Sequence, residues 1–265
     1  MGVGIGEVAV GFRKTGMGKR AKIDSDIDKG ELSSLLYLMG DKLDPALLGL
    51  LLKQGGTFLQ GVGSSEAPRE GDANWQYGII DGEIPDGASI LDLGCGQGNL
   101  LHHMAKTKNS RVQGVEIDSY NVEICVEKGV PVIQADLDLG LSVFPDKSFE
   151  YVILEETLQT LRRPDTIISE MRRVGRRGIV TFPNFGFWRV RMDLALRGRM
   201  PVTGWLPFRW YQTPNIHLFS IQDFIDYADE IGMKIIGIRV LKNGASHPYQ
   251  KGDNLYAEEA IVTFE

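Results

Sequence analysis

Glycines recur at alternate positions in the segment DLGCGQG, residues 92–98 of the chain. An apolar run at 88–93 predicts a buried strand that leads into this segment, and a helical pattern follows at 98–107. Glycine has no Cβ, so such a loop lets the backbone turn sharply and approach a ligand closely. In an open α/β sheet the first turn lies at the carboxyl edge of the strands, where ligands bind. The pattern therefore predicts a ligand site around this loop.

The spacing of the glycines favours one class of ligand. A dinucleotide fingerprint needs a glycine at its sixth position, which is Asn99 when counted from Gly94 and Leu101 when counted from Gly96. A Walker A loop is excluded because no Gly-Lys-Ser/Thr follows. Asp92, two residues before the first glycine, would repel a pyrophosphate but suits a ligand with an ammonium and a sulfonium group. We therefore expect S-adenosyl-L-methionine as the cofactor.

Acids at the ends of the next two predicted strands extend this site. Glu116 ends the strand predicted at 111–116, and its carboxylate is expected to accept hydrogen bonds from both ribose hydroxyls. Ile117 would form one wall of an adenine slot, and Asp136 would accept the adenine amino group. Acids at strand ends also cap helices, but three in register favour a ligand. The residues predicted to bind the cofactor are Asp92, Gly94, Cys95, Gly96, Gly98, Glu116, Ile117, Asp136, Leu137 and Glu155.

The catalytic residues are less well defined than the cofactor loop. Methyl transfer from a sulfonium is an in-line displacement that needs an oriented nucleophile and sometimes a base. The candidates near the predicted sheet edge are Glu155, Glu156, Asn184, Tyr211 and His217. A structural role for His217 is favoured over a general base. Four scattered histidines and two distant cysteines have no metal-ligand spacing, so no metal site is predicted.

Alternating strands and helices must position these residues. The β-rich runs lie at 88–93, 111–116, 131–135, 149–154 and 177–182. Helical patterns separate several of them, at 98–107, 119–128 and 164–174. Strands that alternate with crossover helices form a parallel sheet covered on both faces.

The C-terminal part has a different pattern. Ser220, with Asp223 three residues later, is a capping-box signal for a helix that ends at Gly232. Strands predicted at 234–241 and 257–264 are joined by a short loop and are expected to pair antiparallel. The predicted fold class is α/β: a doubly wound, seven-stranded, mostly parallel sheet with a C-terminal antiparallel hairpin, Rossmann-like as in class I methyltransferases.

The chain of 265 residues is expected to contain one large domain and an N-terminal extension. Residues 1–72 are interpreted as this extension, a disordered tail with two short helices at 31–40 and 44–53 and a linker. Residues 73–265 form the expected cofactor-binding domain, in which 184–217 is a lid or insertion.

Charge and composition restrict the partners. The net charge of −6 argues against a whole-surface nucleic-acid binder, although residues 162–209 hold eleven arginines and three acids. Those arginines fit an anionic partner surface or merely solvated helix faces. Aromatic residues interleave with arginines over 185–210, a pattern shared by single-strand binders, lids and protein interfaces. No signal peptide or membrane span is apparent, so we predict a cytoplasmic protein without a membrane partner.

Residues 88–220 resemble the MetW family of methionine biosynthesis proteins. The shared stretches include ILDLGCGQGNLL (90–101), QADLDLGL (134–141), YVILEETLQTLRRPD (151–165) and RWYQTPNIHLFS (209–220). The resemblance implies an S-adenosylmethionine-binding protein that supports a homoserine O-acyltransferase of the MetX type through a docking surface at 184–217. Glu155 and Glu156 depart from the smaller or neutral residues expected there. The alternative is an active methyltransferase on a small molecule under the 184–217 lid, with an RNA acceptor less favoured.

Overall fold

Eight strands form one sheet in the computed structural model, which describes residues 75–265 of the chain. Across the sheet they follow the order β3 (Val132–Gln134), β2 (Arg111–Glu116), β1 (Ser89–Leu93), β4 (Phe149–Leu154), β5 (Gly175–Pro183), β8 (Glu259–Phe264), β6 (Ile235–Lys242) and β7 (Ala245–Pro248). Strands β1 to β5 are parallel. Strand β8 is antiparallel to both β5 and β6, and β7 is antiparallel to β6. The fold is therefore α/β with a mostly parallel sheet, as predicted.

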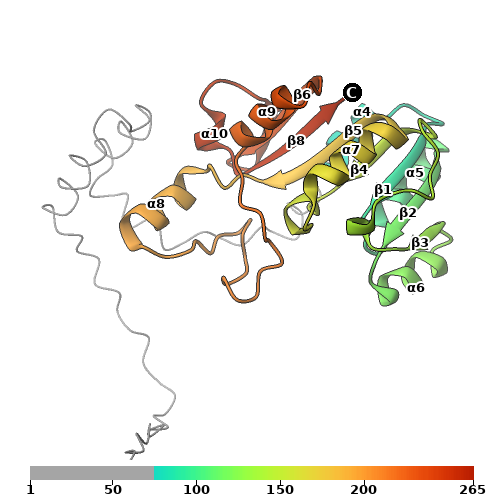
Figure 1. Ribbon diagram of the computed structural model, residues 1–265, viewed down its shortest axis with the longest axis horizontal. Coiled ribbons are helices and arrows are strands. Elements are labelled where there is room, and N and C mark those ends of the chain that lie inside the picture. Colours follow the sequence, from blue (N-terminus) through green and yellow to red (C-terminus); the bar gives the residue numbers. More distant parts are fainter. Residues whose placement is uncertain (1–74) are drawn as a thin grey trace, which may run out of the picture.

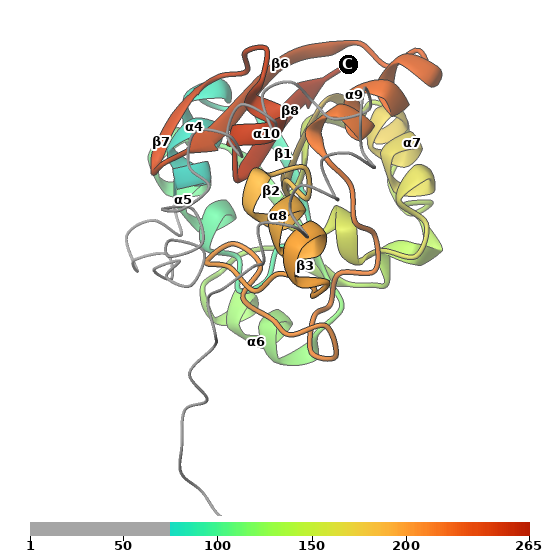
Figure 2. The same cartoon turned by 90° about the vertical axis from the view of Figure 1, so that its left-hand side faces the viewer.

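Helices cover both faces of this sheet (Figure 2). On one face lie α4 (Trp75–Glu83), α5 (Asn99–Lys108) and α6 (Ser119–Glu127), and on the other lie α7 (Pro164–Val174) and α9 (Ile221–Glu230). Side chains alternate along a strand, so Ile90 packs in the apolar cluster under α4 and α5, and the next residue, Leu91, packs under α7 and α9. The sheet is thus doubly wound. No helix within residues 75–265 has the length and hydropathy that a membrane crossing requires.

Local sequence explains where the helices begin. The predicted capping box is present: the Ser220 hydroxyl accepts a hydrogen bond from the backbone of Asp223, whose carboxylate accepts one from the Ser220 backbone. Asp118 caps α6 without a reciprocal bond, since its side chain accepts from the backbone N–H groups of Tyr120 and Asn121 in the first turn. Pro164 begins α7, a position where its missing N–H costs nothing.

The sheet has one strand more than the seven predicted. The additional strand, β7, is four residues long and ends in Pro248, which an edge strand tolerates. The strands predicted at 234–241 and 257–264 do pair antiparallel, as β6 and β8. Helix α4 and the short helix α10 (Asp253–Tyr256) were not predicted. The helices predicted at 31–40 and 44–53, with the tail and linker, lie outside the described residues.

The predicted lid, residues 184–217, leaves the sheet after β5. It contains α8 (Trp188–Arg197), which stands beyond the carboxyl ends of β4 and β5 (Figures 1 and 2). A small cluster of Phe187, Val190 and Leu206 joins this helix to the irregular chain that follows. The returning chain is bound to the body of the protein where the backbone N–H groups of Ile216 and His217 both donate to the carbonyl oxygen of Gln159. The segment therefore lies over the ligand-binding edge of the sheet.

Candidate functional site

The three loop glycines all have left-handed backbone angles, with φ of 73° at Gly94, 51° at Gly96 and 69° at Gly98. A Cβ at Gly94 would lie 2.7 Å from the hydroxyl of Thr157, and one at Gly98 would lie 2.9 Å from the Cys125 sulfur. A Cβ added at Gly96 would have no other atom within 4 Å among the described residues. The first and third glycines are therefore required by packing, whereas the middle one turns an open face toward the space above the sheet.

Glu116 fastens this loop to β2. Its carboxylate accepts hydrogen bonds from the backbone N–H groups of Gly96 at 2.8 Å, Ile117 at 2.8 Å and Asp118 at 2.9 Å. The residue is buried, yet Ile117 beside it is 61% exposed. A large apolar side chain left in solvent next to a buried acid fits the predicted adenine wall, which stays a prediction.

Asp136 and Leu137 lie at the end of β3. One carboxylate oxygen of Asp136 caps the short helix η3 (Leu137–Leu139) by accepting from the backbone N–H of Asp138 at 2.9 Å. Leu137 is buried in the core. The geometry thus gives Asp136 a capping role through one oxygen, and its contact with an adenine amino group stays a prediction.

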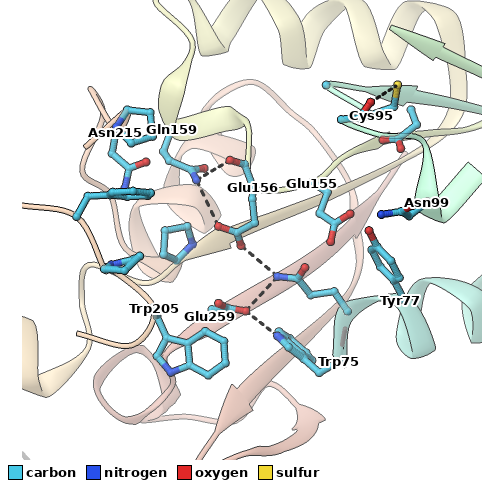
Figure 3. A pocket seen from close by; sticks show the side chains of 18 of the residues that line it. Trp75, Tyr77, Cys95, Asn99, Glu155, Glu156, Gln159, Trp205, Asn215 and Glu259 are labelled. Carbon is cyan, nitrogen blue, oxygen red and sulfur yellow. Dashed lines mark hydrogen bonds between the residues drawn. The ribbon is translucent and has the colours of Figure 1, made fainter. Parts of the chain in front are cut away.

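A pocket of about 520 Å³ opens beside the glycine loop. Its wall is formed by α4, the loop, the segment after β4, the facing ends of β5 and β8, and lid residues between 204 and 215. Figure 3 shows side chains from these separate elements turned toward one another. Of the predicted site residues, the wall includes Asp92, Gly94, Cys95, Gly96 and Glu155. Those outside it are Gly98, Glu116, Ile117, Asp136, Leu137, Tyr211 and His217.

Carboxyl groups dominate the charge of this pocket. Asp92, Glu155, Glu156 and Glu259 belong to its wall, and none of the described residues in the wall is Lys, Arg or His. Burial, together with the carboxylate of Glu116, raises the pKa of Asp92 to about 7. Asp92 is 2% exposed, and its Oδ1 atom has no hydrogen-bond partner among residues 75–265. The pocket therefore lacks the positive charge that would satisfy it.

The two acids after β4 are affected in the same way. Burial raises the pKa of Glu155 to about 8, with further contributions from the charges of Asp92 and Glu156. Burial also raises the pKa of Glu156 to about 7, although hydrogen bonds from Gln76 and Gln159 oppose the shift. Carboxyl groups that hold protons near neutral pH can bind a cation or transfer a proton.

The other catalytic candidates lie away from the pocket. Tyr211 is 58% exposed, and its hydroxyl accepts a hydrogen bond from Arg209. His217 borders a separate apolar cavity beside α7 and α9. Asn184 is buried, and its side chain donates to the carbonyl oxygens of Asn254 and Ala257, so it joins the end of β5 to the turn around α10. Of the five catalytic candidates, Glu155 and Glu156 line the pocket, and Asn184, Tyr211 and His217 do not.

Several pocket residues were not predicted from the sequence. Trp75, Gln76 and Tyr77 come from α4, whose weakly amphipathic sequence gave no helical signal. Glu259 opens β8, and its register partner is Pro183 at the end of β5. In an antiparallel pair, one strand begins beside the end of the other. The sequence signal for the position of Glu259 was therefore the expectation that the strand at 257–264 is antiparallel. Placing that strand next to β5 would have brought Glu259 to the ligand edge.

Comparison with known proteins agrees with this geometry. Residues 75–264 match the family described as methionine biosynthesis protein MetW. A bifunctional methionine biosynthesis protein MetXA/MetW from Rhodopirellula baltica is 36% identical over 193 residues, which is 68% of this chain and 31% of that protein. The chain therefore spans about a third of that relative.

Solved structures with the same fold carry more than one activity. A methyltransferase from Thermotoga maritima has a TM-score of 0.53 at 13% identity, and the match covers 87% of this chain and 98% of that one. The [4+2]-cyclase SpnF has a TM-score of 0.52 at 15% identity, with 76% of this chain and 83% of that one covered. At such identities the similarity shows the fold alone.

Proposed function

The chain belongs to the MetW family of methionine biosynthesis proteins, and from this premise we propose that it binds S-adenosyl-L-methionine and supports a homoserine O-acyltransferase. The observation that carries the proposal is the unpartnered carboxylate oxygen of Asp92, buried in the pocket wall beside the open face of Gly96. A buried acceptor without a partner is unfavourable, and a ligand ammonium group would satisfy it. The residues present therefore fit the cofactor.

Each predicted residue would hold a different part of the cofactor. Asp92 would bind the ammonium group, and the loop around Gly96 would lie against the ligand without a Cβ in the way. Glu116 already accepts three backbone hydrogen bonds, but a carboxylate has about four acceptor positions, which leaves capacity for a ribose hydroxyl. Ile117 would pack on the adenine ring, and the second oxygen of Asp136 would accept from the adenine amino group. The supporting residues are Gly94, Cys95, Gly98, Leu137 and Glu155.

When bound, the cofactor supplies a methyl group on a positively charged sulfur. The chain itself would supply carboxyl groups to the positively charged parts of the cofactor, because Asp92 and Glu155 line the same pocket. The lid contributes Trp205 and Phe208 to the pocket wall on one side.

Thermal unfolding tests the cofactor. A ligand that binds only the folded state raises the melting temperature, so S-adenosylmethionine and S-adenosylhomocysteine are both expected to do so. Absence of a shift with either compound, at concentrations up to the millimolar range, would remove this part of the proposal.

The lid has the character of a protein interface. Seven of the fifteen large apolar side chains that are exposed within residues 75–265 lie in the lid, between 194 and 216. Trp210, Tyr211 and Phe208 are 74%, 58% and 51% exposed. Aromatic residues are enriched at interfaces, and the rings of Trp210 and Tyr211 pack edge to face with their centroids 5.6 Å apart. The relative that carries both MetXA and MetW in its name supports an acyltransferase as the partner.

Mixing the purified chain with the homoserine O-acyltransferase of the same organism tests the partnership. We expect the two proteins to co-elute and the rate of acyl transfer to change. Trp210→Ala should weaken co-elution, whereas Tyr120→Ala, which removes a side chain 67% exposed on α6, should not. No complex and no change in rate, with or without S-adenosylmethionine, would contradict the proposal.

A second candidate function is methyl transfer to a small molecule. It is favoured by the extension of the pocket past the glycine loop to Trp75 and Glu259, which leaves space beyond the proposed cofactor. Transfer of an isotope-labelled methyl group into a metabolite extract would support it. Labelled cofactor that binds but transfers nothing in any extract would contradict it.

Methylation of RNA has less support. Arg173, on α7, is held by the carboxylates of Glu170 and Asp146, and Arg177 pairs with Glu265. These members of the arginine-rich stretch are neutralised within the protein.

A further inference from the structure

The pocket has a second end, away from the glycine loop and under the lid. There Glu156 and Glu259 meet from the segment after β4 and the start of β8 (Figure 3). Trp75 and Trp205, from α4 and the lid, lie on the same side of the pocket as Glu259. We call these four residues and Gln159 the lid-side subsite.

Within residues 75–265, the groups that donate to the two carboxylates are all neutral. The side-chain nitrogen of Gln76 donates to Glu156 at 3.1 Å and to Glu259 at 3.0 Å. The indole nitrogen of Trp75 donates to Glu259 at 2.7 Å, and Gln159 donates to Glu156. Two buried acids that share one amide nitrogen repel each other unless one holds a proton or a cation lies between them.

Gln159 gives an independent sign of a missing ligand. It is 3% exposed, and its side-chain oxygen has no hydrogen-bond partner in the part of the chain that the structure describes. Its nitrogen donates to the backbone carbonyl oxygen of Glu156 at 2.8 Å. Rotating the amide by half a turn would place its oxygen against that carbonyl, so the present orientation is fixed and the oxygen is left as a free acceptor.

The backbone holds Glu156 in an unusual conformation. Its φ is 48°, in the left-handed region that non-glycine residues rarely adopt. Its N–H donates to both the carbonyl and the hydroxyl oxygen of Thr181 on β5. Strain of this kind persists where the surrounding structure imposes it, and it clusters at ligand sites.

The charged groups around the subsite are also unbalanced. Asp92 and Glu155 continue the acidic wall toward the glycine loop, and burial raises the pKa of Glu259 well above its ordinary value. The charges of Lys242 and Arg189 oppose the rise in the pKa of Glu258, the residue before β8, and neither is among the groups that shift the pKa of Glu156 or Glu259. No group of three or more acidic, His or Cys side chains within residues 75–265 has the arrangement of a metal site. An organic cation needs no such set of ligands and would balance the two carboxylates when they are ionised.

We propose that the lid-side subsite binds a small organic ammonium ion. Its three N–H donors match the carboxylates of Glu156 and Glu259 and the oxygen of Gln159, and the indole rings of Trp75 and Trp205 supply cation–π surface. The proposal deepens the proposed function, since this ligand would lie beside the bound cofactor. Its recognition residues are nonetheless separate from those of the glycine loop.

Calorimetric titration of the full chain with n-propylammonium tests the subsite, with 1-propanol as the uncharged control. We expect the ammonium to bind and 1-propanol not to bind. At pH 7 binding should release protons, measured as a dependence of the heat on the buffer, because a cation lowers the pKa of the carboxyl groups that it contacts. Equal affinity for the two compounds would overturn the proposal.

Matched variants locate the binding. Glu259→Gln and Glu156→Gln should each weaken the binding of n-propylammonium by roughly tenfold or more. Glu258→Gln, which changes the neighbouring residue on the side of Lys242, should leave this binding unchanged. Trp205→Ala provides a variant outside the hydrogen-bonded core if either glutamine variant fails to fold. Binding that survives all of these changes would place the amine elsewhere and refute the subsite.

Titration with S-adenosylhomocysteine separates the two proposals. If wild type binds S-adenosylhomocysteine but not n-propylammonium, the subsite fails and the cofactor proposal stands. If it binds only n-propylammonium, the cofactor proposal fails and the subsite stands.

Discussion

The backbone N–H of Gly96 donates a 2.8 Å hydrogen bond to the carboxylate of Glu116, which ties the glycine loop to the neighbouring strand β2. The same carboxylate accepts from Ile117 and Asp118, so one buried acid sets the start of the turn beyond β2 as well. Loop shape and the predicted ribose contact therefore depend on a single side chain.

Glu116→Ala is expected to weaken S-adenosylhomocysteine binding by roughly tenfold or more and to destabilise the fold by about 1–3 kcal/mol, because three backbone donors lose their acceptor. Calorimetric titration and urea unfolding measure the two effects. Glu116→Gln should behave almost as badly, since an amide replaces one accepting oxygen with a donor. Glu123→Ala, on the exposed face of α6, is the control. Full-strength binding by Glu116→Ala would contradict the predicted ribose contact.

Alanine at the first two loop glycines should have unequal effects. Gly96→Ala adds a Cβ in open space and is expected to cost about 1–2 kcal/mol of stability through its left-handed backbone alone. Gly94→Ala adds the clash with Thr157 and should cost more. Gly96→Val should still fold but lose the thermal shift with S-adenosylhomocysteine, because the branched side chain enters the pocket. A retained shift in Gly96→Val would place the ligand elsewhere.

The stability of the ligand-free protein should fall as the pH rises from about 5 to 8. Asp92, with an ordinary pKa of 3.8, has a folded pKa of about 7, and Glu155, with an ordinary pKa of 4.5, has one of about 8. The folded state therefore binds more protons than the unfolded state across this window. Stability that is fully present below pH 4 is lost as these groups ionise.

Urea unfolding at a series of pH values measures this trend, and Asp92→Asn is expected to flatten it. If the free energy of unfolding instead rises between pH 5 and 8, and Asp92→Asn has the same pH dependence as wild type, these carboxyl groups ionise in the folded protein without loss of stability. S-adenosylmethionine should oppose the loss of stability most strongly near pH 8, where more of the acids are ionised.

Arg173→Ala should destabilise the fold by about 1–3 kcal/mol and leave cofactor binding unchanged. Its guanidinium donates to the carboxylates of Glu170 and Asp146 and to two backbone carbonyl oxygens, those of Leu141 and Phe144. Arg172→Ala, which loses one 3.5 Å contact with Gly232, should have little effect. Urea unfolding compares the two variants. Equal stability would mean that the solvent-exposed part of this network carries no energy.

The sequence predicts elements whose signals are local. Strands 111–116 and 149–154 and the helix at 164–174 have the predicted bounds, because apolar periodicity and Pro164 mark them directly. The capping box at Ser220 is equally local. Helix α4 and strand β7 were missed, since one is weakly amphipathic and the other is four residues long.

The residues of the candidate site likewise divide into those that local sequence patterns predict and those that depend on the tertiary structure. Asp92 and the glycine loop follow from spacing within a few residues, and Glu155 follows from its position after a strand. Tyr211 and His217 belong to the irregular chain of the lid, whose course local patterns do not predict, and both lie outside the pocket. Glu259 depends on the order of strands across the sheet, which local patterns do not encode.

Gln159 connects the outer surface to the pocket interior. Its backbone carbonyl holds the returning lid through Ile216 and His217, while its side chain binds Glu156. A protein that docks on the lid and shifts this chain would move an acceptor and a carboxylate inside the pocket at the same time. Thermodynamic reciprocity then requires that the ligand inside alter the affinity for the protein outside by the same factor, so one glutamine would serve as an allosteric relay between them.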